Sequence, residues 1–166
     1  MCAGGLFQAM KALVKMGMPV FGTCAGCILL SDRVSSSLRG GDNTKVAHLD
    51  GIEAIAVYGE HHIGGLDIDT CRNFFGRQTR SFKAPAISES ESLKNFPCVF
   101  IRAPAIAHVG DNASVLARVI HDGEEIVVAV RQGNLLGTCF HPELSGDDRV
   151  HQYFLSIVED YIRLSK

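Results

Sequence analysis

The pentapeptide at residues 22–26 constrains the fold of this chain more than any other feature. It reads Gly-Thr-Cys-Ala-Gly and stands between the apolar residues 19–21 and the apolar residues 28–30. Glycines on both sides of a central cysteine suit a sharp strand-to-helix turn, because larger side chains would clash there. A strand that turns at once into a helix, beginning near residue 25, indicates a layered α/β domain.

Such a turn makes Cys24 a candidate nucleophile, because it lifts the central side chain into an exposed and strained position. A helix N-terminus beside the thiol lowers its pKa and favours the reactive thiolate. The backbone N–H of Ala25 would then point at an oxyanion forming beside Cys24. Taken alone, the pentapeptide suits a buried structural cysteine equally well.

The remaining apolar pattern predicts a helix at each end of the chain and strands between them. Apolar residues at helical spacing predict helices over 6–14, ended by Gly17, and over 150–162. Ser145 and Asp148 resemble a capping box that opens the second of these helices. The expected strands are 19–21, 66–70, 99–102, 114–119, 125–130 and 135–140.

The glycine- and serine-rich residues 34–62 predict an irregular surface insertion, with one strand at 54–58. The length of 166 residues suits a single domain over residues 1–166.

Composition excludes several classes of protein. The chain is 46% hydrophobic and 20% charged with a formal net charge of −2, which excludes disorder as the main state. The near-neutral balance argues against a binder of nucleic acid or of anionic membranes. No apolar run reaches the roughly 18 residues of a membrane span. We therefore expect a cytoplasmic enzyme whose six cysteines are reduced thiols.

The tripeptide His141-Pro142-Glu143 supplies what a cysteine nucleophile needs. It follows the apolar residues 135–140, so both polar side chains leave the end of an expected strand, where α/β sites lie. Pro142 favours an extended conformation at His141, so His141 and Glu143 can project from one side of the chain. A carboxylate bound to one imidazole nitrogen leaves the other free to take a thiol proton.

Four segments can be compared with known families: residues 20–26, 72–78 (Arg-Asn-Phe-Phe-Gly-Arg-Gln), 99–104 (Val-Phe-Ile-Arg-Ala-Pro) and 139–144. Together they resemble the glutaminase subunits of pyridoxal 5′-phosphate synthase, which are triad-type (class I) glutamine amidotransferases. The first and last segments are shared by many triad amidotransferases, and the middle two single out the vitamin B6 branch. The resemblance implies a flavodoxin-like three-layer α/β fold.

The resemblance also implies a reaction. Cys24 would attack the side-chain amide of L-glutamine, with His141 as base and then acid and Glu143 orienting His141. Arg72, Ile101 and Arg102 would contact the substrate; without the resemblance, surface ion pairing would explain both arginines. Ammonia would pass to a separate (β/α)₈-barrel synthase subunit for pyridoxal 5′-phosphate biosynthesis. No cofactor or metal is implied.

The chain departs from the family pattern at its start. The family's first strands and its Gly-Gly-Glu-Ser loop have no counterpart here, so we expect an N-terminally truncated fold. That loop supplies the second oxyanion donor, and one such donor is worth on the order of 10²–10³ in rate. We therefore expect weak or no activity from the chain alone, and self-association through an exposed sheet edge.

Other interpretations remain open. Cys24 and Cys27 form a C-x-x-C, the spacing of thiol–disulfide oxidoreductases. Residues 60–62 (Glu-His-His) suggest a zinc site, although adjacent histidines point apart and a solvated loop suits them better. A glutaminase that serves another synthase is the alternative within the amidotransferases. His151 lies off the apolar stripe of its expected helix, which predicts a solvent-facing side chain.

Overall fold

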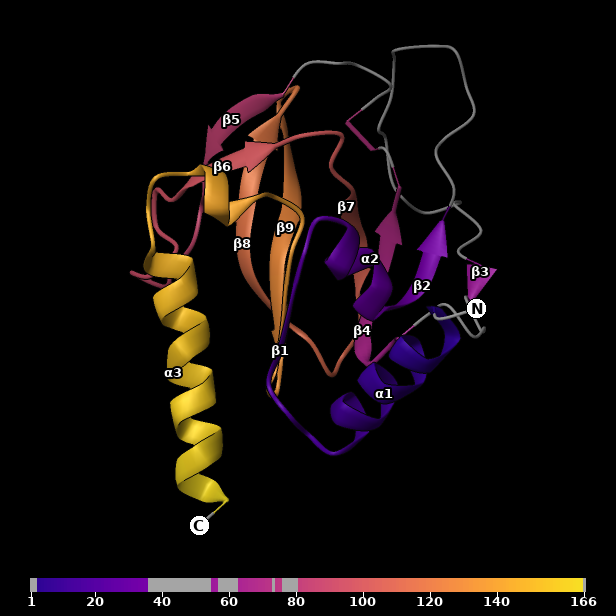
Figure 1. The fold of residues 1–166 in the computed structure, drawn as a ribbon. Helices are drawn as coiled ribbons and strands as arrows, with labels where there is room; N and C mark the ends of the chain where they lie inside the picture. Colours follow the sequence, from indigo (N-terminus) through magenta and orange to yellow (C-terminus); the bar gives the residue numbers. More distant parts are fainter. Residues whose placement is uncertain (1–2, 36–54, 57–62, 73, 76–80, 166) are drawn as a thin grey trace.

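The computed structural model describes residues 3–35, 55–56, 63–72, 74–75 and 81–165 (Figure 1). Its helices are α1 (Ala3–Lys15), α2 (Ala25–Leu30), α3 (Arg149–Leu164) and the short 3₁₀ helix η1 (Pro142–Leu144). Its strands are β1 (Val20–Thr23), β2 (Ser31–Ser35), β3 (Ile55–Ala56), β4 (Leu66–Cys71), β5 (Phe82–Pro85), β6 (Pro97–Phe100), β7 (Ala105–Val109), β8 (Ser114–His121), β9 (Glu124–Gln132) and β10 (Leu135–Thr138). Within these ranges, no helix is long and apolar enough to cross a membrane.

Most strands form one mixed sheet. The eight-stranded sheet has the order β1-β10-β9-β7-β4-β2-β3, with β8 paired to β9, and a separate two-stranded sheet joins β5 to β6. The pairs β1–β10 and β2–β4 are parallel, and the other pairs in the sheet are antiparallel. The strand β1, which leads to the candidate nucleophile, therefore lies beside β10, which leads to the His-Pro-Glu tripeptide.

Helices cover both faces of the sheet at β1. Successive residues of a strand point to opposite faces. Phe21 packs its ring 5.3 Å from that of Phe154 in α3, whereas the backbone of Gly22 lies against Gly26 in α2. A helix–sheet–helix arrangement follows, and Figure 1 shows α3 set apart from α1 and α2. This is the three-layer α/β architecture that the sequence predicts.

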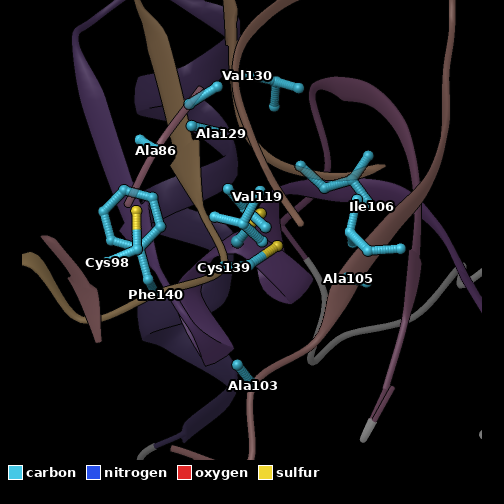
Figure 2. Close-up of a cluster of buried hydrophobic side chains, with 14 of the residues drawn as sticks. Ala86, Cys98, Ala103, Ala105, Ile106, Val119, Ala129, Val130, Cys139 and Phe140 are labelled. Atoms are coloured by element: carbon cyan, nitrogen blue, oxygen red, sulfur yellow. The ribbon is translucent and has the colours of Figure 1, made fainter. Parts of the chain in front are cut away.

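One part of the core lies between the sheet and the β5–β6 ribbon. Phe140, at 0% exposure, packs its ring 5.6 Å from Phe96 and 6.0 Å from Phe100. Figure 2 shows Phe140 with Cys98 and Cys139 in this cluster of buried side chains. The packing of Phe140 therefore fixes the position of the backbone immediately before His141.

Most expected elements are present near their predicted positions. The first helix ends before Gly17, whose φ of 75° is the left-handed conformation that suits a glycine after a helix. The strand expected at 99–102 ends at Phe100 instead, since Arg102 has a φ of 49°, which no strand residue adopts. The strand expected at 135–140 ends at Thr138.

Three strands were not predicted, namely β2, β5 and β7. The strand β2 includes Val34 and Ser35, so the predicted irregular segment at 34–62 begins within a buried strand. Ser35 donates its hydroxyl to the Thr70 carbonyl, and Ser31 donates to the carbonyl of Ile68 at 3.0 Å. Satisfied hydroxyls can be buried, which the serine-rich sequence did not indicate. Of the strand expected at 54–58, residues 55–56 are described as β3, and the rest lies outside the described residues.

The predicted capping box of the last helix is wrong. The N-cap residue Asp148 makes no side-chain cap hydrogen bond. Ser145 instead ends η1, and its hydroxyl donates to the Pro142 carbonyl at 2.6 Å. Asp147 accepts the backbone N–H of Arg149 at 3.0 Å, so the carboxylate that serves the helix start comes one residue earlier than predicted.

Candidate active site

The Cys24 turn, residues 22–26, has the strained geometry that its sequence predicts. Cys24 has φ 49° and ψ −107° and stands immediately before α2. A Cβ on Gly22 would lie 2.6 Å from the backbone carbon and oxygen of Gly26, so a glycine is required there. A Cβ on Gly26 would meet nothing within 4 Å. The predicted steric need for glycine therefore holds at Gly22 and is wrong at Gly26.

Strand pairing brings Cys24 and His141 to the same edge of the sheet. Thr23 pairs with Thr138 at the end of the parallel β1–β10 ladder. The backbone N–H of Cys24 continues that ladder by donating to the Thr138 carbonyl at 2.8 Å. The carboxyl ends of parallel neighbouring strands meet at one edge of a sheet. His141 stands three residues after Thr138, the partner of the Cys24 turn, and therefore lies at the same edge as Cys24.

His141 and Glu143 form a preorganised pair. Nδ1 of His141 lies 2.8 Å from Oε1 of Glu143. The backbone N–H of His141 donates to the Val99 carbonyl at 2.8 Å, and Pro142 occupies the first position of η1. His141 has φ −104° and ψ 89°, the extended conformation expected of a residue before proline. With Nδ1 held by the carboxylate, Nε2 is the nitrogen left for proton transfer.

The electrostatics at Glu143 favour the ionised carboxylate. Burial raises the pKa of Glu143, but hydrogen bonds from His141 and from its own backbone, with the nearby charges of His141 and His151, outweigh burial. The resulting pKa lies below the ordinary value of 4.5. Glu143 is therefore a carboxylate at neutral pH and can act as the acceptor that fixes the imidazole.

The pKa of the Cys24 thiol is shifted in the opposite direction from the one predicted. Burial raises the pKa of Cys24 above its ordinary value of 9.0, and the hydrogen bond from the Ala25 backbone, which lowers it, does not compensate. The predicted lowering by the helix N-terminus is therefore wrong for the half-buried thiol. The Ala25 N–H donates a hydrogen bond to the Cys24 sulfur, and its role as an oxyanion donor stays a prediction.

The expected substrate residues lie at two places. Ile101 and Arg102 are exposed and follow β6, close to His141 because Val99 of the same strand accepts the His141 N–H. Arg72 is exposed at the end of β4, where its backbone N–H donates to the Ser35 carbonyl at 3.2 Å. In the sheet order β10, β9 and β7 stand between β1 and β4. Backbone pairing alone therefore brings Ile101 and Arg102, but not Arg72, towards His141.

His151 belongs to the surroundings of the site, which sequence reasoning missed. Its ring lies edge-on 6.2 Å from that of Phe21, and its charge helps to lower the pKa of Glu143. The predicted solvent-facing position is wrong, because His151 is half-buried on the α3 side that meets β1. The available signal was Phe154, which stands three residues after His151 and therefore on the same side of the helix.

The part of the chain that the structure describes holds no group of three or more His, Cys, Asp or Glu side chains arranged for a metal ion. The candidate zinc residues 60–62 lie outside it. The described cysteines are free thiols: Cys24, Cys27, Cys71, Cys98 and Cys139.

Several relatives are similar in sequence over most of this chain. It is 42% identical over 156 residues to the pyridoxal 5′-phosphate synthase subunit PdxT of Clavibacter sepedonicus, covering 94% of this chain and 64% of the relative. The PdxT of Leifsonia xyli subsp. xyli is 44% identical over 151 residues, covering 91% of this chain and 65% of the relative. A probable PDX2 subunit of Arabidopsis thaliana is 37% identical over 180 residues, covering 93% of this chain and 64% of the relative. The chain thus spans just under two thirds of the length of these relatives.

A solved structure and a family model point the same way. A crystal structure of a glutamine amidotransferase matches with a TM-score of 0.69 and 35% identity, covering 93% of this chain and 69% of the other. The flavodoxin-like class I amidotransferase fold predicted from the sequence is thereby confirmed. The family model described as the SNO glutamine amidotransferase family matches residues 1–160. The chain belongs to the SNO glutamine amidotransferase family.

Proposed function

We propose that this chain hydrolyses the side-chain amide of L-glutamine to L-glutamate and ammonia through Cys24, His141 and Glu143. The observation that carries the proposal is the register that joins the Cys24 turn to Thr138, three residues before the hydrogen-bonded His141–Glu143 pair. The family to which the chain belongs supports the same chemistry.

The first half of the reaction forms a thioester. The raised pKa keeps the Cys24 thiol protonated at neutral pH, so attack on the amide carbon needs a base. His141 takes the thiol proton at Nε2 while Glu143 holds Nδ1. The Ala25 N–H donates to the oxyanion that forms on the former carbonyl oxygen. His141 then gives its proton to the departing nitrogen, and ammonia leaves.

Water completes the reaction. His141, neutral again, takes a proton from water, and the resulting hydroxide attacks the thioester carbon. The Ala25 N–H again donates to the oxyanion. The carbon–sulfur bond breaks, Cys24 recovers its proton, and L-glutamate is released.

Three residues are assigned to the substrate. Arg72 and Arg102 would bind its α-carboxylate, since a guanidinium can hold a carboxylate through two parallel hydrogen bonds. Ile101 is 42% exposed beside Arg102 and would contact the aliphatic part of the substrate. The assignment of Arg72 rests on the sequence resemblance alone, whereas Ile101 and Arg102 also follow β6, whose Val99 accepts the His141 N–H.

The ammonia is assigned to a synthase partner. The names of the relatives, subunits of pyridoxal 5′-phosphate synthase, support a separate synthase subunit that receives ammonia, for which we infer a (β/α)₈ barrel and a cytoplasmic complex. Another amidotransferase complex is the alternative. Stimulation by one synthase and not by others distinguishes the two.

The edge of the sheet at β1 is a proposed site of self-association. The strand β1 stands at one end of the sheet order, with β10 as its partner on one side. An edge strand presents backbone groups that a second copy of the chain can pair with. Light scattering after size exclusion tests this: a dimer or larger species is expected, and a monodisperse monomer contradicts it.

The test of the proposed function is release of glutamate and ammonia from L-glutamine, with and without the barrel synthase subunit. Release that depends on Cys24 and rises with the synthase is expected. Release that is equal in Cys24→Ala, or absent in both conditions, contradicts the proposal.

A further inference from the structure

The Cys24 turn carries a second thiol that the proposed reaction does not use. Cys27 lies on the first turn of α2 and has 0% exposure. Cys139, also at 0%, follows β10 in the same cluster of buried side chains (Figure 2). Cys24 itself is half-buried and therefore the most accessible of the three.

The backbone places Cys24 and Cys27 at disulfide distance. The N–H of Cys27 donates to the Cys24 carbonyl at 3.1 Å, which closes a four-residue turn. Such a turn holds its end Cα atoms within about 7 Å. Disulfides join Cα atoms roughly 4.4–6.8 Å apart, so the turn brings the two Cα atoms close to the separation that a bridge needs.

Cys27 also faces Cys139, so two pairings compete. The Sγ of Cys27 lies 3.1 Å from the point where a Cβ on Gly137 would stand, and the Cys139 thiol is hydrogen-bonded to Cys27. An oxidant from solvent reaches Cys24 before either buried thiol. The first oxidised sulfur is therefore that of Cys24, and Cys27 is its neighbour along the turn.

We propose that Cys27 is a resolving thiol for Cys24, so that peroxide converts the pair to a reversible Cys24–Cys27 disulfide. The Cys24 thiol first gives up its proton, and the small fraction present as thiolate attacks one oxygen of hydrogen peroxide. The O–O bond breaks, and the departing hydroxide takes up that proton to become water. The Cys27 sulfur then attacks the Cys24 sulfenic acid, and its hydroxyl leaves as water with the Cys27 proton. Two thiols and one peroxide thus give one disulfide and two waters.

The disulfide would have two consequences. A bridged Cys24 cannot attack an amide, so any glutaminase activity stops until a dithiol reduces the bond. The bridge also prevents further oxidation of Cys24 to the irreversible sulfinic acid. The first consequence rests on the proposed function, whereas the second does not.

Peptide mapping tests the proposal on the whole chain. The protein is treated with hydrogen peroxide, its remaining thiols are alkylated, and it is digested with trypsin. Cys24 and Cys27 share the tryptic peptide 16–33, whereas Cys139 lies on the peptide 132–149. We expect the first peptide to lose about 2 Da, the mass of the two hydrogens removed, and to recover both thiols with a dithiol. Oxidised Cys24 beside an alkylated Cys27, or a cross-link between the two peptides, overturns the proposal.

Variants separate the resolving role from a structural one. In Cys27→Ser, and in Cys27→Ala as a second variant, Cys24 should accumulate as sulfinic acid that a dithiol does not reverse. Cys139→Ser should still form the Cys24–Cys27 bridge. If Cys27→Ser and Cys27→Ala recover their Cys24 thiol as wild type does, Cys27 is not the resolving residue.

The readout by mass keeps this inference apart from the proposed function. A bridged peptide in a chain that releases no glutamate supports the inference and contradicts the glutaminase. Glutamate release that peroxide abolishes without a bridge does the reverse.

Discussion

The backbone N–H of Cys24 donates a 2.8 Å hydrogen bond to the carbonyl oxygen of Thr138. This bond extends the parallel β1–β10 ladder by one residue beyond the strands. It fixes the Cys24 turn to the end of β10, three residues before His141, so sheet register positions the two groups that we propose react. Residues positioned by strands hold a catalytic geometry more closely than residues on loops.

Replacing Glu143 with glutamine should lower glutamine hydrolysis strongly. Glutamine keeps the size of the side chain but loses the charge that holds Nδ1 of His141 at 2.8 Å. General acid–base catalysis contributes about 10²–10⁴-fold, and a loss in that range is expected in kcat. Because the Glu143 side chain is 51% exposed, the free energy of unfolding should change by less than about 1 kcal/mol. The exposed Glu159→Gln is the control, and equal activity in both variants would contradict the assigned role.

The two glycines of the Cys24 turn should respond differently to alanine. A Cβ on Gly22 would lie 2.6 Å from backbone atoms of Gly26, so Gly22→Ala should cost about 1–3 kcal/mol in free energy of unfolding. A Cβ on Gly26 meets open space within a helix, where alanine is favoured over glycine by about 0.5–1 kcal/mol. Denaturant unfolding of both variants measures the contrast. Equal destabilisation would show that the turn is packed differently.

The reactivity of Cys24 should keep rising into alkaline solution. Burial raises the pKa of Cys24 above 9.0, so its thiolate fraction is small at neutral pH and grows with pH beyond that value. Rates of alkylation by iodoacetamide, followed at Cys24 by peptide mass, measure this. A plateau reached near neutral pH would mean that the helix N-terminus, and not burial, dominates.

The carboxylate that serves the start of α3 should be Asp147. Removing it in Asp147→Ala should cost about 1–2 kcal/mol, whereas Asp148→Ala, with no capping bond, should cost less. Side-chain hydrogen bonds from Arg149 lower the pKa of Asp147 below 3.8. The stabilisation is therefore present above pH 3.8 and is lost as the pH falls through the lowered value. Denaturant unfolding of the wild type and both variants across acidic pH measures this. If the difference in free energy of unfolding between the wild type and Asp147→Ala does not shrink as the pH falls, the account is contradicted.

Local chemistry was predictable from the sequence, and burial was not. The Cys24 turn and the His141–Glu143 pair carry their geometry in glycine and proline, whose backbone limits are local. The strand β2 escaped prediction because its serines are buried through hydroxyl bonds to another strand. The direction of the Cys24 pKa and the burial of His151 likewise depend on distant segments that pack around them.

Covalent labelling tests the central claim most directly. An electrophilic diazoketone analogue of L-glutamine should alkylate the thiol that attacks the amide carbon, and peptide mass should locate it. One adduct on Cys24, suppressed by excess L-glutamine and slowed in His141→Ala, is the predicted result. An adduct on another cysteine, or labelling of Cys24 that L-glutamine does not suppress, would contradict the account.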